Sequence, residues 1–165
     1  MVKQLIHTKD EIFKLLDDIC DPEIPVVSIH EMGILRDVKL YEDTCEVIIT
    51  PTYSGCPAMD IIEQDIIALL KKNGIPNIKV TTIYSPAWTT DWMSDTTKEK
   101  LRKFGIAAPL HSSCSSWLKS NQENVHCPLC NSTHTKLISQ FGSTACKALY
   151  KCEDCLEPFD YFKCI

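Results

Sequence analysis

The chain is organised around the stretch Thr50-Pro51-Thr52-Tyr53-Ser54-Gly55-Cys56-Pro57. An apolar run, 47–49, precedes this loop, and an amphipathic segment, 58–73, follows it. A strand, a tight loop and a helix in this order place the Cys56 sulfur beside a helix N-terminus, where unpaired N–H groups and the helix dipole favour a thiolate. We therefore expect a lowered pKa for Cys56, which suits a nucleophile, a redox centre or a soft-metal ligand. A cysteine that only packs is the alternative.

The segments on either side of this loop predict a small α+β domain. Thr8-x-x-Glu11 is a capping box that begins a helix. This helix should end before Asp21-Pro22, because the residue preceding a proline avoids the helical conformation. The chain then predicts a hairpin of two strands, 34–40 and 45–50, the helix 58–73, a third strand, 78–84, and a short helix, 95–104. Helices should cover one face of the sheet.

A second, cysteine-rich module is expected at residues 126–165. Two C-x-x-C pairs, Cys127-Pro-Leu-Cys130 and Cys152-Glu-Asp-Cys155, are separated by 21 residues. Between and after them, residues 135–141, 144–150 and 157–164 predict three short strands. Four thiolates on two loops of a short antiparallel sheet are typical of a zinc ribbon. A module of about 40 residues has too small a core to fold alone, so a structural zinc is expected.

Alternatives remain open for the other cysteines and for the metal. A Cys₄ set also suits a rubredoxin-like iron or an iron–sulfur cluster. Cys146 and Cys164 lie in the same module and are possible additional ligands, although a spare buried cysteine more often packs as a small hydrophobe. Cys20 and Cys45 fall on apolar faces and are expected in the core.

Composition limits the domain organisation and the class of function. Residues 1–105 form the expected α+β domain, and 106–125, with five serines, form an expected linker. Residues 1–105 hold 12 Lys+Arg against 17 Asp+Glu, and residues 106–165 hold 5 of each, so no basic stripe indicates nucleic-acid binding. The sequence contains no apolar run of about 18 residues, which is the length that a membrane-spanning helix needs. The N-terminus turns polar too soon for a signal peptide. Ten cysteines in an expected cytoplasmic protein favour metal or thiol chemistry.

Catalytic motifs are not evident in this sequence. It contains no phosphate-binding loop, no G-x-G-x-x-G and no G-x-S-x-G. Asp21 and Glu23 form an acidic pair that suits metal or proton chemistry. An equally good interpretation is that they only cap and solvate the loop. No histidine lies near Cys56 in the sequence, and His30 could reach it only if the fold brings the two together. A thiol enzyme acting alone is therefore the weakest interpretation.

Several motifs resemble those of the MIP18-like (DUF59) family. The matching residues are Asp21-Pro22-Glu23-Ile24-Pro25, Gly33-Ile34, Thr50-x-Thr52-x-x-x-Cys56-Pro57 and Pro86-Ala87-Trp88-Thr89-Thr90-Asp91-Trp92-Met93-Ser94. The resemblance implies a MIP18-like fold and a link to iron–sulfur cluster assembly. It also implies a reactive cysteine at the position of Cys56.

Over nearly its whole length the chain is similar to the D (or J) subunits of bacterial phenylacetyl-CoA 1,2-epoxidase systems. Further residues carry this likeness: Phe141-Gly-Ser-Thr-Ala-Cys146-Lys-Ala-Leu-Tyr150 and Glu157-Pro-Phe-Asp-Tyr-Phe-Lys-Cys164-Ile165. The resemblance implies aerobic phenylacetate degradation, in which another subunit carries the di-iron oxygenase and a ferredoxin-type reductase supplies electrons. The chain does not contain the two Glu-x-x-His motifs of a di-iron carboxylate site, which agrees with an accessory role.

We therefore expect an accessory subunit that is not catalytic by itself and that binds the oxygenase or reductase subunits. In this hypothesis Cys56, supported by Asp21, Glu23, Thr50 and Thr52, transiently holds iron or an iron–sulfur cluster for delivery. Cys127, Cys130, Cys152 and Cys155 hold a structural zinc. The alternatives are an electron-transfer protein that uses the C-terminal cysteines, and a scaffold that delivers no metal.

Overall fold

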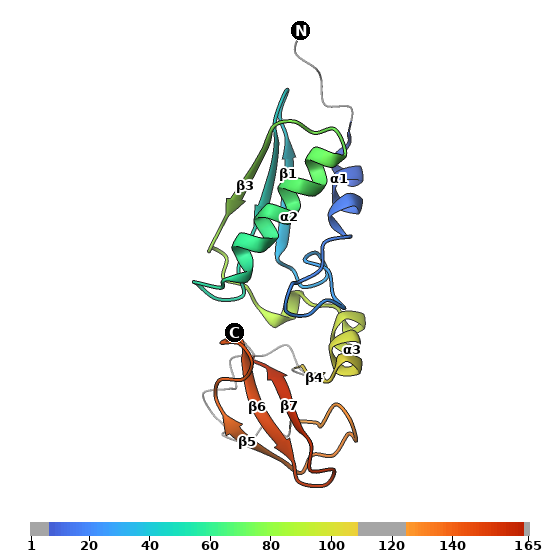
Figure 1. The fold of residues 1–165 in the computed structure, drawn as a ribbon, viewed down its shortest axis with the longest axis vertical. Coiled ribbons are helices and arrows are strands. Elements are labelled where there is room, and N and C mark those ends of the chain that lie inside the picture. Colours follow the sequence, from blue (N-terminus) through green and yellow to red (C-terminus); the bar gives the residue numbers. More distant parts are fainter. Residues whose placement is uncertain (1–6, 109–124, 164–165) are drawn as a thin grey trace. The chain divides into compact units, whose positions relative to one another are not determined.

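Residues 7–108 and 125–163 are described in the computed structural model of the chain, shown in Figure 1. The chain divides into two units, Met1–Trp88 and Thr89–Ile165. The N-terminal unit contains α1 (Lys9–Leu16), β1 (Leu35–Leu40), β2 (Cys45–Ile49), α2 (Ala58–Lys72) and β3 (Ile78–Thr82). No helix within these described ranges is long and apolar enough to cross a membrane.

The capping box at the start of α1 is confirmed. The Thr8 hydroxyl accepts the backbone N–H of Glu11 at 3.3 Å, and the Glu11 carboxylate accepts the N–H of Thr8 at 2.8 Å. Two of the N–H groups that a helix start leaves unpaired are thereby satisfied. Ile12 and Leu16 lie one turn apart and are fully buried, so α1 presents one apolar stripe to the core.

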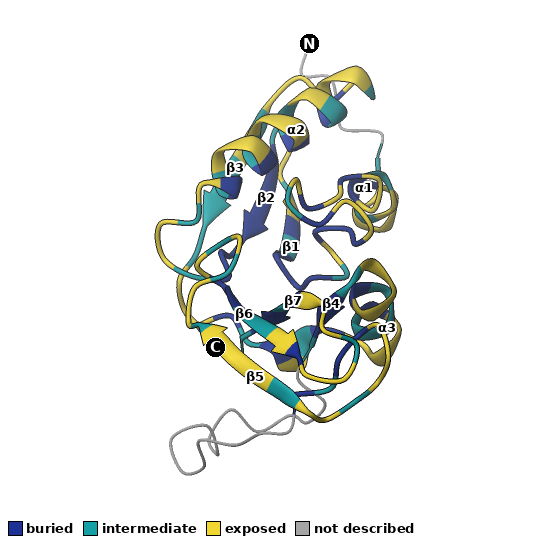
Figure 2. Ribbon diagram, turned by 60° about the horizontal axis from the view of Figure 1, so that its bottom comes forward, coloured by how far each residue is buried: buried dark blue, intermediate teal, exposed yellow. Residues whose placement is uncertain are grey.

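The sheet of the N-terminal unit has the strand order β1-β2-β3. β1 and β2 pair antiparallel, which confirms the predicted hairpin, whereas β3 pairs parallel to β2. A parallel pair needs a crossover, and α2 supplies it by crossing the sheet, with α1 beside it (Figure 1). Every residue of the central strand β2 is buried (Figure 2). This strand leads directly into the loop that ends at Cys56.

One predicted core position in the N-terminal unit is wrong. Cys45 is fully buried as expected, but Cys20 is exposed, because it follows the end of α1 and only forms an isolated bridge with Ser28. Ile61 on α2 is 49% exposed, whereas Ile62 and Ile66 fill the core. The buried stripe of α2 is therefore narrower than the apolar pattern of its sequence.

The C-terminal unit begins with a 3₁₀ turn, Thr90–Trp92, and α3 (Asp95–Phe104), whose N-cap is Ser94. Its sheet is formed by β4 (Ile106–Ala107), β5 (Thr135–Ser139), β6 (Lys147–Cys152) and β7 (Pro158–Phe162), in the order β4-β7-β6-β5. β5, β6 and β7 pair antiparallel, as a zinc ribbon requires, and β4 pairs parallel to β7. The α+β class with a C-terminal all-β ribbon is confirmed.

The unit boundary differs from the boundaries expected from composition. The sequence indicated a domain over 1–105 and a linker over 106–125. In the structure Ile106 and Ala107 are buried and hydrogen-bonded to β7, and α3 falls in the C-terminal unit. Val125, at the other end of the expected linker, is buried in the same core as Ala107. Residues 109–124 lie outside the described residues.

The core of the ribbon is small. Its buried members are Ala107, Val125, Cys127, Ala148, Cys152, Phe159 and Tyr161. Two of these are cysteines of the C-x-x-C pairs, so the sulfur cluster is itself part of the core. Most of the edge strand β5 is exposed (Figure 2). An apolar core of this size supplies little stability, and a metal crosslink would compensate for it.

Candidate functional site

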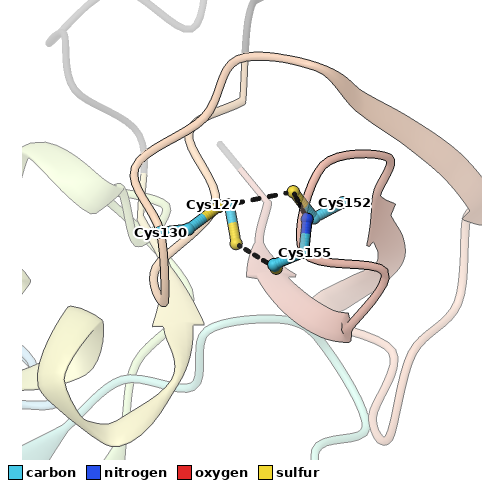
Figure 3. Close-up of side chains that lie close together, drawn as sticks. All are labelled: Cys127, Cys130, Cys152 and Cys155. Atoms are coloured by element: carbon cyan, nitrogen blue, oxygen red, sulfur yellow. Dashed lines mark hydrogen bonds between the residues drawn. The ribbon is translucent and has the colours of Figure 1, made fainter.

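Four cysteine sulfurs converge in the C-terminal unit. Cys127 and Cys130 lie on the loop before β5, and Cys152 and Cys155 lie at the end of β6 and in the loop that follows (Figure 3). One ligand atom from each lies within 4.8 Å of all the others. The sulfurs of Cys127 and Cys155 are 3.7 Å apart, and those of Cys130 and Cys152 are 3.5 Å apart. The structure thus brings together the four cysteines of the predicted cage.

These distances suit one tetrahedral metal ion. A disulfide would need about 2.05 Å between sulfurs, so the four thiols are not paired covalently. A zinc–sulfur bond of about 2.3 Å in a tetrahedron separates the sulfurs by about 3.8 Å. The cluster therefore has the donor set and the spacing of a closed, metal-binding Cys₄ site.

Each C-x-x-C pair sits on a tight backbone loop, which we call a knuckle: residues 127–132 and 152–157. In the first knuckle the N–H of Asn131 donates to the carbonyl of Cys127 at 2.9 Å. The residue after each second cysteine has a positive φ, 62° at Asn131 and 68° at Leu156. This left-handed residue reverses the chain so that both sulfurs of the pair face the same point.

Backbone N–H groups act to lower the pKa of both thiols in the second knuckle. The N–H of Cys155 donates to the Cys152 sulfur at 3.5 Å and is the main reason that the pKa of Cys152 falls to about 7. The N–H of Glu157 acts to lower the pKa of Cys155, but burial and the three neighbouring sulfurs raise it to about 12. Thiols bind metal ions as thiolates, so metal binding at these sulfurs would release protons.

Of the two possible additional ligands, Cys146 does not join this cluster. Cys146 is buried at the start of β6, and its sulfur lies 3.0 Å from the Thr144 hydroxyl. Within the described ranges, the cluster of three or more metal-ligating groups contains the four knuckle cysteines and not Cys146. Cys164 lies outside the described residues.

The loop at Cys56 has the predicted strand–loop–helix geometry. Gly55 adopts a φ of 90°, a conformation that glycine reaches without strain, and turns the chain into α2. α2 begins at Ala58, so Pro57 is the N-cap rather than the first helical residue. Cys56 is half-buried, and the backbone N–H of Ala58 interacts with its sulfur.

The predicted low pKa of Cys56 is wrong. Burial of the thiol is the largest influence and raises its pKa, and the carboxylates of Glu23 and Asp21 raise it further. The Ala58 N–H does act in the predicted direction, but it is outweighed. At neutral pH the thiol is therefore protonated, which disfavours a free-standing nucleophile.

The four residues expected to support Cys56 take different positions. Asp21 is buried and its Oδ1 accepts the N–H groups of Glu23 and Ile24, at 2.8 and 2.9 Å, so it holds the acidic loop in a turn. Both carboxylates of the acidic loop act to raise the pKa of the Cys56 thiol. Thr50 and Thr52, on the segment after β2, are also buried.

Two further features of this site were not predicted from the sequence. The Tyr53 side chain hydrogen-bonds to Cys56, and this bond acts to lower the pKa of the thiol. In the sequence, only the position of Tyr53 three residues before the cysteine could have indicated this contact. The buried Thr50 Oγ1 has no hydrogen-bond partner in the part of the chain that the structure describes. A buried hydroxyl without a partner is uncommon and is often found where a ligand binds. His30 instead contacts Asp17, at 2.6 Å, and the Phe13 ring.

Two family models match the chain. One, described as an iron–sulfur cluster assembly protein, matches residues 9–84. The other, described as the PaaD zinc beta ribbon domain, matches residues 111–163. These ranges correspond to the sheet unit that carries Cys56 and to the region that carries the four knuckle cysteines.

Solved structures and relatives support both assignments. A DUF59 domain of unknown function from Bacillus anthracis is 28% identical with a TM-score of 0.53, covering 56% of this chain and 90% of that one. An Fe–S protein maturation auxiliary factor of Porphyromonas gingivalis (strain ATCC BAA-308 / W83) is 30% identical over 58% of this chain and 91% of its own length. A protein of Escherichia coli (strain K12), provisionally named as the D subunit of 1,2-phenylacetyl-CoA epoxidase, is 49% identical over 94% of this chain and 92% of its own length.

The last match extends through both units, and its coverage is nearly complete on both sides. The resemblance drawn from the sequence motifs is thereby confirmed. The chain belongs to the family of 1,2-phenylacetyl-CoA epoxidase D subunits, in which a DUF59-type iron–sulfur cluster assembly domain precedes a zinc ribbon.

Proposed function

We propose that this protein is a cytoplasmic accessory component of a phenylacetyl-CoA epoxidase system that helps to load iron or an iron–sulfur cluster into partner subunits. The cargo would be received at Cys56 and passed to the oxygenase or the reductase. The observation that carries this proposal is the acidic environment of a half-buried, protonated thiol. Two comparisons support the proposal. The chain belongs to the family of epoxidase D subunits, and Fe–S maturation factors are similar to its N-terminal domain.

The carboxylates around Cys56 distinguish metal handling from nucleophilic catalysis. Glu23 and Asp21 disfavour the thiolate as long as no cation is present. A bound cation reverses this effect, because it attracts both the carboxylates and the sulfur and displaces the thiol proton. Cys56 therefore gains its charge only together with its cargo, and Asp21 keeps the acidic loop folded against it.

The Cys56 site alone is incomplete as a cluster site. Among the described residues, the donor atoms of Asp21, Glu23 and Cys56 do not converge as closely as the four knuckle sulfurs do. An incomplete ligand set suits a cargo that must leave again, with the remaining ligands supplied by a partner. The orphan hydroxyl of Thr50 lies at the end of the strand that leads into the same loop.

The knuckle cysteines serve a different purpose in this proposal. Cys127, Cys130, Cys152 and Cys155 would hold a structural zinc, because four thiolates close a tetrahedral site and leave no open position for chemistry. The zinc would crosslink the knuckles and compensate for the small ribbon core. In this proposal the four knuckle cysteines stabilise the ribbon, and the residues of the Cys56 loop transfer the iron or the cluster.

Two experiments test these roles separately. Metal analysis and a visible spectrum of the purified chain should show one zinc and no absorption. A coloured iron protein would instead support electron transfer through the knuckle cysteines. In cells, Cys56→Ala should lower phenylacetyl-CoA epoxidation and the metal content of the partner subunits. Cys20→Ala, which removes an exposed cysteine one residue before Asp21, is the matched control. Wild-type epoxidation and metal content in Cys56→Ala cells would leave only a scaffolding role.

A further inference from the structure

A hydrogen-bonded network of side chains connects the two knuckles outside the sulfur cluster. The Ser132 hydroxyl of the first knuckle donates to Oδ2 of Asp154 in the second. The other carboxylate oxygen of Asp154 lies 3.2 Å from Nδ1 of His134. Ser132 also accepts the backbone N–H of His134 at 2.9 Å, and the N–H of Glu153 donates to the His134 carbonyl at 2.7 Å. The Asp154 carboxylate thus contacts two side chains of the opposite chain segment, those of Ser132 and His134.

The same residues reach the sulfurs through their backbones. The N–H of Ser132 interacts with the sulfur of Cys130, and the N–H of Asp154 interacts with that of Cys152. The side-chain bond between Ser132 and Asp154 therefore fixes two peptide groups whose N–H groups interact with sulfurs on opposite knuckles. Groups that orient metal ligands in this way affect metal affinity, although they do not touch the metal.

A further connection between the two knuckles lies on the sheet side. The strand pairing of β5 with β6 joins the segments at Thr135 and Cys152. Beyond this pairing, the sulfurs of the second knuckle are held in a loop whose exposed residues include Glu153 and Leu156. Without an additional bond this loop could swing away from the first knuckle and open the cage.

We propose that Ser132 and Asp154 form a latch that holds the two knuckles closed and slows the exchange of the zinc. His134 assists by orienting the carboxylate. Both latch residues are positioning residues, because they act through the backbone around the cysteines. This inference rests on the zinc of the proposed function, and it explains how a resident metal would stay in place in a protein that also moves iron.

The test is the rate at which the full zinc-loaded chain gives up its metal to the chromogenic chelator 4-(2-pyridylazo)resorcinol. Ser132→Ala and Asp154→Ala should each release zinc about tenfold faster than the wild-type chain, as expected for the loss of a group that orients the metal ligands. The effect in the double variant should be well below the product of the two single effects, because either change alone already breaks the Ser132–Asp154 bond. Ser132→Thr, which keeps a hydroxyl, should retain slow release.

Two matched controls separate the latch from general effects. Thr133→Ala removes a hydroxyl next to Ser132, and Glu153→Gln removes a carboxylate next to Asp154; both side chains are exposed. Neither should change the rate. The absorption spectrum of the cobalt-substituted chain should show four thiolate ligands in every variant, so that altered release is not a changed ligand set.

The outcomes distinguish this inference from the function on which it rests. Stoichiometric zinc with wild-type release in Ser132→Ala and Asp154→Ala would overturn the latch and leave the structural zinc intact. Equal acceleration by Glu153→Gln, or additive effects in the double variant, would also overturn it. A wild-type chain that contains no metal would overturn both the latch and the proposed structural zinc.

Discussion

Cys56 illustrates how burial can outweigh helix electrostatics at a single residue. The N–H of Ala58 interacts with the sulfur, as the helix N-terminus predicts, yet the pKa is raised because the thiol is desolvated and two carboxylates lie nearby. The sequence spacing indicated the first influence but contained no measure of the others. The raised pKa therefore disfavours an activated nucleophile at this position.

Removal of one carboxylate charge should make Cys56 more acidic. Glu23 raises the pKa of the thiol, so Glu23→Gln should lower it and increase the thiolate fraction at a given pH. We expect the pH profile of Cys56 alkylation by iodoacetamide, followed by mass spectrometry, to move to lower pH. Glu42→Gln, in the exposed turn between β1 and β2, should leave the profile unchanged. A profile that moves to higher pH, or not at all, would contradict this electrostatic account.

At the scale of the elements, a polar group ties β2 to its neighbours. Glu46 on β2 accepts hydrogen bonds from Lys79 and Thr81 on β3, at 2.8 and 2.6 Å, and from the Tyr41 hydroxyl at 3.1 Å. The bond from Lys79, followed by that from Thr81, lowers the pKa of Glu46 to about 2. A buried strand can thus carry a carboxylate because three donors satisfy it.

This carboxylate should make the N-terminal unit sensitive to acid. Its folded pKa of about 2 lies below the ordinary value of 4.5, so the stabilisation is complete above pH 4.5 and disappears as the pH falls toward 2. Glu46→Gln should therefore lower the free energy of unfolding at pH 7, and its difference from wild type should shrink below about pH 4.5. Urea unfolding followed by circular dichroism at each pH measures this difference. Tyr41→Phe should cost less at pH 7; a constant difference at all pH values would exclude the linkage.

Each knuckle has one residue in the left-handed backbone conformation, and the two residues at this position tolerate that conformation to different degrees. Asparagine tolerates the left-handed conformation at residue 131, but Leu156 occupies the equivalent place in the second knuckle at a φ of 68°. The Leu156 side chain is 64% exposed, so packing returns little for this strain. The second knuckle is therefore the less stable of the two loops.

Glycine at position 156 should stabilise the ribbon. Leu156→Gly relieves left-handed strain and should gain about 0.5–1 kcal/mol of unfolding free energy after the entropic cost of glycine. Leu129→Gly is the control, since Leu129 is similarly exposed at 61% but is not among the residues with positive φ. It should be neutral or destabilising. The urea midpoint for zinc release reports both variants, and equal shifts for the two would contradict the strain argument.

For the whole molecule, local signals predicted most of the fold and long-range contacts did not appear in the sequence. The helices and the long strands have periodicities and caps that can be read in one window, and the spacing of the C-x-x-C pairs predicted which sulfurs converge. β4 has only two residues, and its partner β7 lies far along the chain, so no local pattern distinguished Ile106 from a linker. The exposure of Cys20 and the raised pKa of Cys56 likewise depend on neighbours that only folding supplies.

Metal removal should unfold one unit and spare the other. The N-terminal sheet has a core of buried aliphatic side chains, whereas the ribbon core is small and includes two of the ligand cysteines. After treatment with a strong chelator, amide hydrogen exchange should lose its protection in residues 125–163 and keep it in β2 and α2. Mass spectrometry of peptides measures both regions in one sample. Loss of protection in β2 together with the ribbon would show that the units unfold as one.

The position of β7 between β4 and β6 has a consequence for biosynthesis. A ribosome makes β4 and all four ligand cysteines before it makes β7, the strand that joins β4 to the rest of the sheet. A nascent chain that has emerged as far as Cys155 carries a full set of sulfurs but no strand between β4 and β6. The nascent ribbon can therefore meet a metal ion when β5 and β6 can pair but before the sheet is complete, whereas the three strands of the N-terminal unit have already been made.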